Sequence, residues 1–180
     1  PRIAELSGVP SDSVLALAGD SALAARLEVP GPTLEGYLYP ETYRFASDVD
    51  PVRVLRTMTT RYREFWTRER RARADSMGLT DREAVTLASI VEAEARVDRE
   101  RPIIAAVYLN RLDRGMRLQA DPTVQYALEE PVSRLLYAHI DSVADSPYNT
   151  YTHRGLPPGP IGSPGVASLR AVLRPADVPY

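Results

Sequence analysis

The 180-residue sequence contains no cysteine, no lysine and only two histidines. The absence of cysteine excludes disulfides and thiolate metal sites. The two histidines, His139 and His153, match no metal-binding spacing, so we predict neither a metal nor a cofactor. No run approaches the ~20 apolar residues that span a membrane, and no signal peptide opens the chain.

An excess of positive charge is also missing. The 22 basic residues, all arginine, face 24 acidic ones, which leaves a formal net charge of −2. Nucleic-acid binding selects for a basic face, so we predict no nucleic-acid partner. The 44% of hydrophobic and 26% of charged residues are ordinary for a globular protein of one medium domain. We interpret Pro1 and Tyr180 as cut ends of a longer protein.

Apolar spacings of three and four predict a mainly helical chain. Ser11-Asp12 and Asp20 are predicted to cap two short helices, and Asp50-Pro51 to begin an amphipathic helix that reaches about Asp75. Its basic run, 68–73, is interpreted as a solvated face, with anion binding as the less favoured alternative. Thr80 and Glu83 have the spacing of a capping box, and the helix that follows is predicted over 84–95. Further helices are predicted from Asp98 to Gly115, from Asp121 to about Leu128, and from Ser163 to about Leu173.

Two segments are not helical in pattern. Residues 34–43 place Tyr37, Tyr39 and Tyr43 at odd-numbered positions, which predicts a half-buried strand or extended segment. An aromatic wall for a sugar chain is the alternative. Residues 146–161 form a long loop rich in proline and glycine, which we expect to be ordered and functional.

The helix over 84–95 has no charge in its first eight residues and then carries Glu92 and Glu94. Apolar residues on every side predict burial of most of its circumference. The two acids point about 200° apart and cannot share one substrate oxygen. Burial would raise the pKa of a carboxyl group, as a general acid requires. The alternative is that both acids reach solvent or pair with Arg96 or Arg111. The small Ala88 and Ser89 favour a cleft beside Glu92, but the residues alone leave the choice open.

Four blocks of sequence resemble the YceG-like (MltG) endolytic murein transglycosylases. They are 87–94 (LASIVEAE), 106–124 (AVYLNRL with GMRLQADPTV), 146–161 (SPYNTY with GLPPGPI) and 34–43 (LEGYLYPETY). The blocks occur in the family's order and cover most of residues 33–175.

The resemblance implies an activity. Members of the family cleave the β-1,4 bond between N-acetylmuramic acid and N-acetylglucosamine inside a peptidoglycan strand, without water, and leave a 1,6-anhydro end that terminates nascent strands. The first acid of the SIVE block, Glu92, would be the single general acid/base. The resemblance further implies a place at the outer face of the bacterial cytoplasmic membrane, with cell-wall synthases (penicillin-binding proteins) as partners.

Polar and aromatic residues of the matching blocks are the candidates for binding the glycan. Amides suit acetamido and hydroxyl groups, and tyrosines stack on sugar faces or donate through their phenols. The candidates are Tyr37, Glu94, Asn110, Arg111, Gln119, Asp121, Thr123, Tyr148, Asn149 and Tyr151. Each has a structural alternative: Asp121 as a helix cap, Arg111 as the partner of a structural carboxylate, and the tyrosines as core.

We therefore expect an α+β fold that is predominantly helical, with a few short strands. Residues 1–32 are expected to be the remnant of a LysM-like lobe or linker, and residues 33–180 the catalytic domain. We expect the family's membrane helix, fuller LysM-like lobe and C-terminal β segment to lie outside this sequence, and Ala93 stands where lysine is common in the family. Two functions remain as alternatives: a peptidoglycan-binding or scaffold module without catalysis, and a hydrolytic muramidase.

Overall fold

The computed structural model describes residues 10–178, except 47, 129 and 131. Within these residues the chain forms nine α-helices and one 3₁₀ helix, and no β-strand. The helices are α2 (Ser11–Gly19), α3 (Ser21–Arg26), α4 (Pro51–Phe65), α5 (Arg68–Ser76), α6 (Asp81–Glu94), η1 (Asp98–Glu100), α7 (Arg101–Asp113), α8 (Asp121–Ala127), α9 (Tyr137–Ser142) and α10 (Val166–Leu173). The predicted helical character is confirmed. The few short strands of the predicted α+β class are not found among the described residues.

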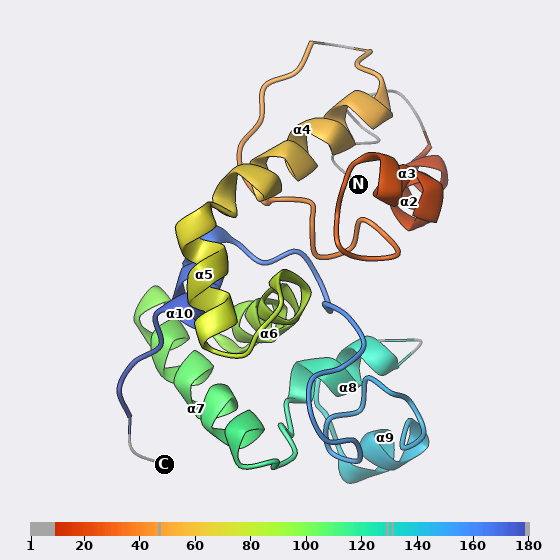
Figure 1. Ribbon diagram of the computed structural model, residues 1–180. Coiled ribbons are helices and arrows are strands. Elements are labelled where there is room, and N and C mark those ends of the chain that lie inside the picture. Colours follow the sequence, from red (N-terminus) through yellow and green to blue (C-terminus); the bar gives the residue numbers. More distant parts are fainter. Residues whose placement is uncertain (1–9, 47, 129, 131, 179–180) are drawn as a thin grey trace.

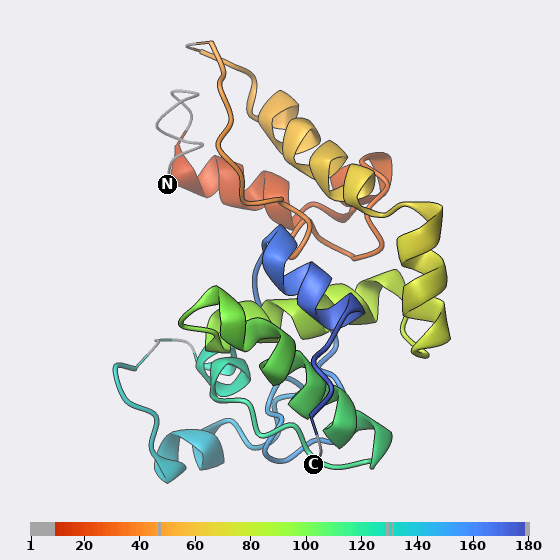
Figure 2. The same ribbon diagram turned by 90° about the vertical axis from the view of Figure 1, so that its left-hand side faces the viewer.

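The helices are arranged around α6. Figures 1 and 2 show α2, α3 and α4 at one end of the molecule, α8 and α9 at the other, and α6, α7 and α10 between them. Helix α6 packs against α5, α7, α8 and α10. Helices far apart in the sequence, such as α5 and α10, therefore meet at the same central element.

Helix α6 begins where its sequence predicts. The hydroxyl of Thr80 accepts from the backbone N–H of Glu83, and the Glu83 carboxylate accepts from the N–H of Thr80 at 2.9 Å. This reciprocal capping satisfies two of the donors that every helix start leaves unpaired. The eight residues of 84–91 are all buried, as predicted. Burial of Leu87 and Ile90, both 0% exposed, stabilises the fold by roughly 1.5–3 kcal/mol each.

The helix predicted from Pro51 to about Asp75 is in fact two helices. Its start is confirmed, since Asp50 accepts from the N–H of Val52 at 3.0 Å and Pro51 is the first helical residue. The chain leaves the helix at Trp66, whose ring packs at right angles to that of Phe65. Thr67 then caps α5. The prediction of one helix is wrong because core burial of Trp66 and the capping hydroxyl of Thr67 outweigh the continuous helical pattern.

Two predicted caps are also wrong. Helix α2 follows Pro10 and has no side-chain cap, although Asp20 does cap α3 through the N–H groups of Ala22 and Leu23. Asp121 is the first residue of α8 and makes no capping bond there. The Asp121 carboxylate instead accepts from the Tyr151 hydroxyl at 2.5 Å, a partner 30 residues away.

The segment 34–43 is not a strand. Tyr37 and Tyr39 are 1% and 5% exposed, and the Tyr37 ring packs edge-on against Tyr62 at 5.0 Å. Gly36 has a φ of +88°, and a Cβ placed on it would lie 2.2 Å from the Pro160 ring. The segment is therefore pressed against the proline-rich loop, and its two inner tyrosines belong to the core and not to an exposed aromatic wall.

One cluster of buried side chains runs through the molecule. The cluster includes Leu23 of α3 and Leu27, which directly follows α3. It also includes Leu55 of α4, Leu87 of α6 and Leu169 of α10. Residues on both sides of position 32 thus share a core. None of the helices in the described part of the chain has the length and apolar character needed to cross a membrane.

Candidate active site

Glu92 lies in the last turn of α6, where three donors from other segments hold its carboxylate. Oε2 accepts from the Ser168 hydroxyl at 2.7 Å and from the backbone N–H of Gly165 at 3.1 Å. Oε1 accepts from Arg101 Nη2 at 3.1 Å. Ser168 and Gly165 belong to α10 and its N-cap, and Arg101 is the first residue of α7. Both carboxylate oxygens are thereby fixed in orientation.

Arg101 is itself held in place. Its Nε donates to the Ser168 hydroxyl at 2.9 Å, and its guanidinium also pairs with the exposed Asp98. The Arg101 side chain is 13% exposed, whereas that of Glu92 is 36% exposed. The carboxylate of Glu92 is therefore both ordered and open to a ligand.

The pKa of Glu92 is lowered from its ordinary value of 4.5. Partial burial alone would raise this pKa, but the hydrogen bonds from Ser168, Gly165 and Arg101 together outweigh burial. The prediction of a raised pKa at Glu92 is therefore wrong for the free protein. In this arrangement Glu92 is a carboxylate at neutral pH.

Glu94 lies on a different face of α6 and has the opposite electrostatics. Its Oε1 accepts from the Tyr108 hydroxyl at 3.0 Å. Burial raises the pKa of Glu94, the Tyr108 hydrogen bond opposes that rise, and the nearby charge of Asp121 adds to it. The expectation that the two acids point apart agrees with these separate partners. Neither pairs with Arg96 or Arg111; the ion pair is between Glu92 and Arg101.

An open cavity of about 730 Å³ begins beside Glu94. Its lining residues come from the end of α6, from α8 and from the loops around them, and are Ala93, Glu94, Ala95, Arg96, Asp121, Pro122, Gln125, Tyr126, Ser133 and Ile161. A smaller cavity of about 250 Å³ adjoins Glu94 on the side of α7 and includes Arg111 and Gln119. Glu94 thus faces both hollows.

Some of the predicted binding residues are brought together. Glu94 and Asp121 line the larger cavity, and Glu94, Arg111 and Gln119 line the smaller one. Asp121 continues, with Tyr151, into a third depression formed by 134–140. Glu94 is shared by the first two cavities and Asp121 by the first and third, so these five residues border hollows that adjoin one another.

Other predicted residues have structural positions. Asn149 is 0% exposed and donates to the carbonyl groups of Ile140 and Val143, and Thr123, also 0% exposed, bonds to Thr150 at 2.8 Å. The hydrogen bonds of Asn149 hold the 146–153 loop against α9, and the bond between Thr123 and Thr150 holds it against α8, so both side chains are committed to the fold.

The other candidates also have structural contacts. Tyr37 is in the core, Asn110 donates to the carbonyl of Val178, and the Tyr148 ring packs against that of Tyr126 at 4.7 Å. Arg111 donates through Nη1 to the carbonyl of Leu118 and so holds backbone, not a carboxylate.

Ala88 and Ser89 do not open a cleft beside Glu92. They are 0% and 3% exposed, and the Ser89 hydroxyl accepts from the N–H of Ile161 at 3.0 Å while it donates to its own helix. Small residues on this face allow the proline-rich loop to approach α6 closely. The cleft lies beyond the end of the helix instead.

The partners of the two acids were not among the predicted site residues. Arg101, Gly165 and Ser168 hold Glu92, and Tyr108 holds Glu94. Tyr108 lies within one of the four matching blocks and could have been singled out by its place there. Ser168 had no local signal, because it is 76 residues from Glu92 in the sequence. No group of three or more His, Asp or Glu side chains that could hold a metal ion occurs in the described part of the chain.

The fold and this site define a helical domain in which one buried central helix ends in two differently held acids. The sequence model of the YceG-like family matches residues 4–180, and the chain belongs to this family. A crystal structure of a putative YceG-like protein from Listeria monocytogenes superimposes with a TM-score of 0.84 at 35% identity, covering 99% of this chain and 63% of that one.

Curated relatives carry the name endolytic murein transglycosylase. The Bacillus subtilis (strain 168) protein is 40% identical over 151 residues, which are 82% of this chain and 40% of that protein. The Streptococcus pneumoniae (strain D39) protein is 34% identical over 147 residues, which are 78% of this chain and 26% of that protein. The chain therefore spans less than half the length of these relatives.

Proposed function

We propose that this chain is the catalytic region of an endolytic peptidoglycan lytic transglycosylase, with Glu92 as its single general acid/base. The observation that carries the proposal is the carboxylate of Glu92, held by Arg101, Ser168 and Gly165 yet 36% exposed, in a member of the YceG-like family. An acid that must give and then take back one proton needs this combination of order and access.

The reaction consumes no water. Protonated Glu92 gives its proton to the glycosidic oxygen as the bond from that oxygen to C1 of the muramic acid breaks. The C6 hydroxyl of the same sugar then attacks C1, and its proton returns to Glu92. The products are a free 4-hydroxyl on one fragment and a 1,6-anhydro end on the other, and the enzyme regains its starting state.

In the free protein, Glu92 has the protonation state that the second step of the reaction requires. Three donors favour the carboxylate of Glu92, which is the form that acts as base. The acid form requires one of these donors to be given up when the glycan binds. Substrate oxygen atoms that accept from Ser168 or from the Gly165 N–H would do this and would raise the pKa of Glu92.

The separate faces of Glu92 and Glu94 favour this reaction over simple hydrolysis. A glycoside hydrolase places two carboxyl groups on either side of the scissile bond. Here each acid has its own partners, Arg101 for one and Tyr108 for the other. We assign Glu94, with Asp121, Gln119, Arg111 and Tyr151, to glycan binding in the cavities along α8.

The test compares Glu92→Gln with Glu94→Gln on purified peptidoglycan, with mass spectrometry of the released fragments. Loss of Glu92 should lower the rate by about 10²–10⁴-fold, the usual contribution of general acid–base catalysis. Loss of Glu94 should act mainly on KM. Full activity of Glu92→Gln together with an inactive Glu94→Gln would reverse the assignment.

The products decide the reaction class. Anhydro ends support transglycosylation, whereas reducing muramic acid ends, one water heavier, would identify a hydrolytic muramidase. Binding of glycan with no product from the unaltered chain would identify a binding module. For the whole protein we propose action in the bacterial envelope, at the outer face of the cytoplasmic membrane and beside cell-wall synthases; a topology reporter fused to the full-length protein tests the location.

A further inference from the structure

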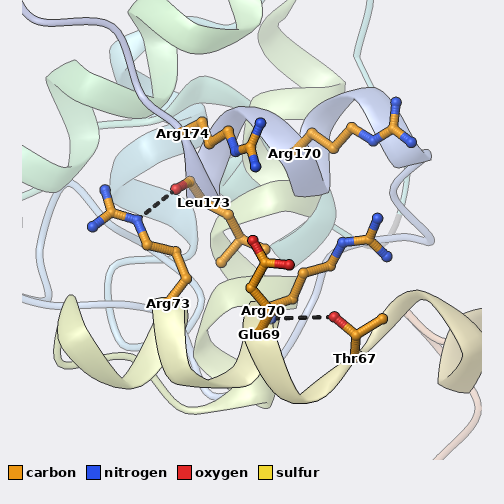
Figure 3. Close-up of a pocket in the computed structure, with 7 residues that line it drawn as sticks. All are labelled: Thr67, Glu69, Arg70, Arg73, Arg170, Leu173 and Arg174. Atoms are coloured by element: carbon orange, nitrogen blue, oxygen red, sulfur yellow. Dashed lines mark hydrogen bonds between the residues drawn. The ribbon is translucent and has the colours of Figure 1, made fainter.

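The cavity between α5 and α10 is lined mostly by arginines. It measures about 540 Å³ and is bordered by Arg70 and Arg73 from α5 and by Arg170 and Arg174 from the end of α10, with Thr67, Glu69 and Leu173 completing the lining. Figure 3 shows the four guanidinium groups on the two helices with Leu173 and Glu69 between them. In a chain with a formal charge of −2, such a concentration of one sign needs an explanation.

Two of the four arginines are fixed by the fold. Arg73 donates through Nε to the carbonyl of Leu173 at 2.9 Å, which ties α5 to the end of α10. Arg70 donates to the carbonyl of Phe65, and its guanidinium lies over the Phe65 ring at 4.4 Å. These contacts leave further N–H donors on both side chains, because a guanidinium carries five.

The other two arginines have no such role. Arg170 and Arg174 are exposed, and their side chains make no hydrogen bond or ion pair with any residue that the structure describes. Cations near the C-terminal end of a helix are stabilised modestly by the helix dipole. The helix dipole favours both cations at the end of α10 but does not account for two more arginines that face them from α5.

The cavity holds too little negative charge to balance these arginines. Glu69 is the one acidic side chain in its lining, and it forms no ion pair within 4.0 Å among the residues described. Four like charges against one opposite charge repel one another, and an added anion relieves that repulsion.

The cavity is distinct from the site around Glu92. Arg170 follows Ser168 by two residues on α10, so the two side chains point about 200° apart at 100° per residue. Ser168 faces Glu92, and Arg170 faces α5. The proposed lytic reaction does not use the face of α10 that carries Arg170.

We propose that the cavity between α5 and α10 is a binding site for a phosphate-bearing group, a diphosphate or phosphate ester. A planar carboxylate is saturated by one bidentate arginine, whereas a phosphate offers oxygen atoms in several directions and suits guanidinium groups that border one cavity from two helices. The Thr67 hydroxyl, whose oxygen accepts from the N–H of Arg70, is free to donate as well.

The first test is calorimetric titration of the chain with inorganic diphosphate at low ionic strength. Arg170→Gln with Arg174→Gln should weaken binding by at least about tenfold, since each charge-assisted hydrogen bond contributes about that factor. Arg53→Gln with Arg56→Gln, two exposed arginines of α4, removes the same charge and should leave the affinity unchanged. Equal weakening by both pairs, or no binding to the unaltered chain, overturns the proposal.

A second substitution should change the affinity for diphosphate in the opposite direction. Glu69→Gln removes the one carboxylate in the cavity and should tighten diphosphate binding several-fold, whereas a purely structural role for the arginines predicts no change. Glu92→Gln should bind diphosphate as the unaltered chain does, which keeps this test independent of the catalytic assignment. Malonate binding as tightly as diphosphate would contradict the preference for phosphate.

The source of the phosphate is separated by a vesicle assay. Co-sedimentation with vesicles of phosphatidylglycerol but not of phosphatidylcholine, lost in the Arg170/Arg174 variant, supports a lipid headgroup. Binding of free diphosphate without vesicle binding supports a soluble phosphate compound. Vesicle binding that survives the double substitution would contradict a lipid headgroup in this cavity.

Discussion

Arg101 and Glu92 form the ion pair at the centre of the proposed active site. Nη2 of Arg101 lies 3.1 Å from Oε1 of Glu92, and the arginine side chain is 13% exposed. The same guanidinium donates to Ser168, which donates in turn to the other carboxylate oxygen of Glu92. Arg101 therefore orients both the acid and the hydroxyl that holds it, and it is a positioning residue in the proposed reaction.

Substitution of Arg101 should change the pH profile and not only the rate. Arg101→Gln removes a charge that lowers the pKa of Glu92, so this pKa should rise. Because the first step needs protonated Glu92, the basic limb of the kcat/KM profile should move to higher pH while the maximal rate falls. Arg101→Lys keeps the charge, so the basic limb should stay at the pH of the unaltered protein, while only part of the maximal rate is retained. A lower rate with an unchanged profile in Arg101→Gln would show that Arg101 acts through folding alone.

The two acids should have opposite effects on stability. The pKa of Glu92 is lowered below 4.5 in the fold, so its contribution to stability is present above the unfolded pKa and is lost as pH falls through the folded pKa. The pKa of Glu94 is raised, so its contribution is present below the unfolded pKa and is lost as pH rises through the folded pKa.

At about pH 7, Glu92→Gln should therefore lower Tm and Glu94→Gln should raise it, and both differences should shrink as the pH falls below the ordinary carboxyl pKa. Thermal unfolding followed by circular dichroism at a series of pH values measures this. The exposed Glu130→Gln corrects for the change in net charge. Shifts of the same sign for Glu92→Gln and Glu94→Gln would contradict the assignment of their electrostatics.

Ser89 should matter for both stability and activity. Its hydroxyl is the acceptor for the N–H of Ile161, in the loop that leads to Gly165. Ser89→Ala leaves that partly buried N–H without a partner and should cost about 1–3 kcal/mol of unfolding free energy. Because the loop delivers the Gly165 N–H to Glu92, activity should fall as well.

The matched control is Thr59→Val, which removes a buried hydroxyl that bonds only to carbonyl groups of its own helix. Urea unfolding and product release measured side by side separate the two residues. If Thr59→Val lowers the unfolding free energy as much as Ser89→Ala does, the hydrogen bond from Ile161 to Ser89 contributes no stability of its own.

Gly36 should not tolerate a side chain. Its φ of +88° disfavours every residue with a Cβ, and that Cβ would meet the Pro160 ring at 2.2 and 2.6 Å. Gly36→Ala should therefore destabilise the fold by roughly 2 kcal/mol or more. Gly19→Ala, where a Cβ would meet nothing within 4 Å, is the comparison and should be neutral or slightly stabilising. Similar unfolding midpoints for the two variants would show that the 34–43 segment is not pressed on the loop.

Sequence reasoning succeeded where the determining contacts are local. The capping box of Thr80 and Glu83 and the Asp50-Pro51 helix start lie within three residues of their partners, and both are found as predicted. The break at Trp66 was missed because it depends on which neighbours that ring meets in the core. The aromatic pattern of 34–43 predicts a strand or an extended segment, and a single sequence cannot show that the strand has no partner among the described residues.

The candidate site shows the same limit. The resemblance singled out Glu92, but the direction of its pKa depends on Gly165 and Ser168, 73 and 76 residues further along the chain. Burial could be expected from the apolar helix, whereas the donors that outweigh burial could not. Asp121 and Tyr151 were both named, but the hydrogen bond between them was not foreseen.

The long sequence separation within the Glu92 site also has a consequence for synthesis. Two of the three donors that hold the carboxylate are added to the chain only when translation has passed position 168. A ribosome-bound chain that already contains α6 therefore carries its acid in an unassembled setting. The arrangement proposed for glycan cleavage therefore cannot form before α10 has been synthesised and has packed against α6.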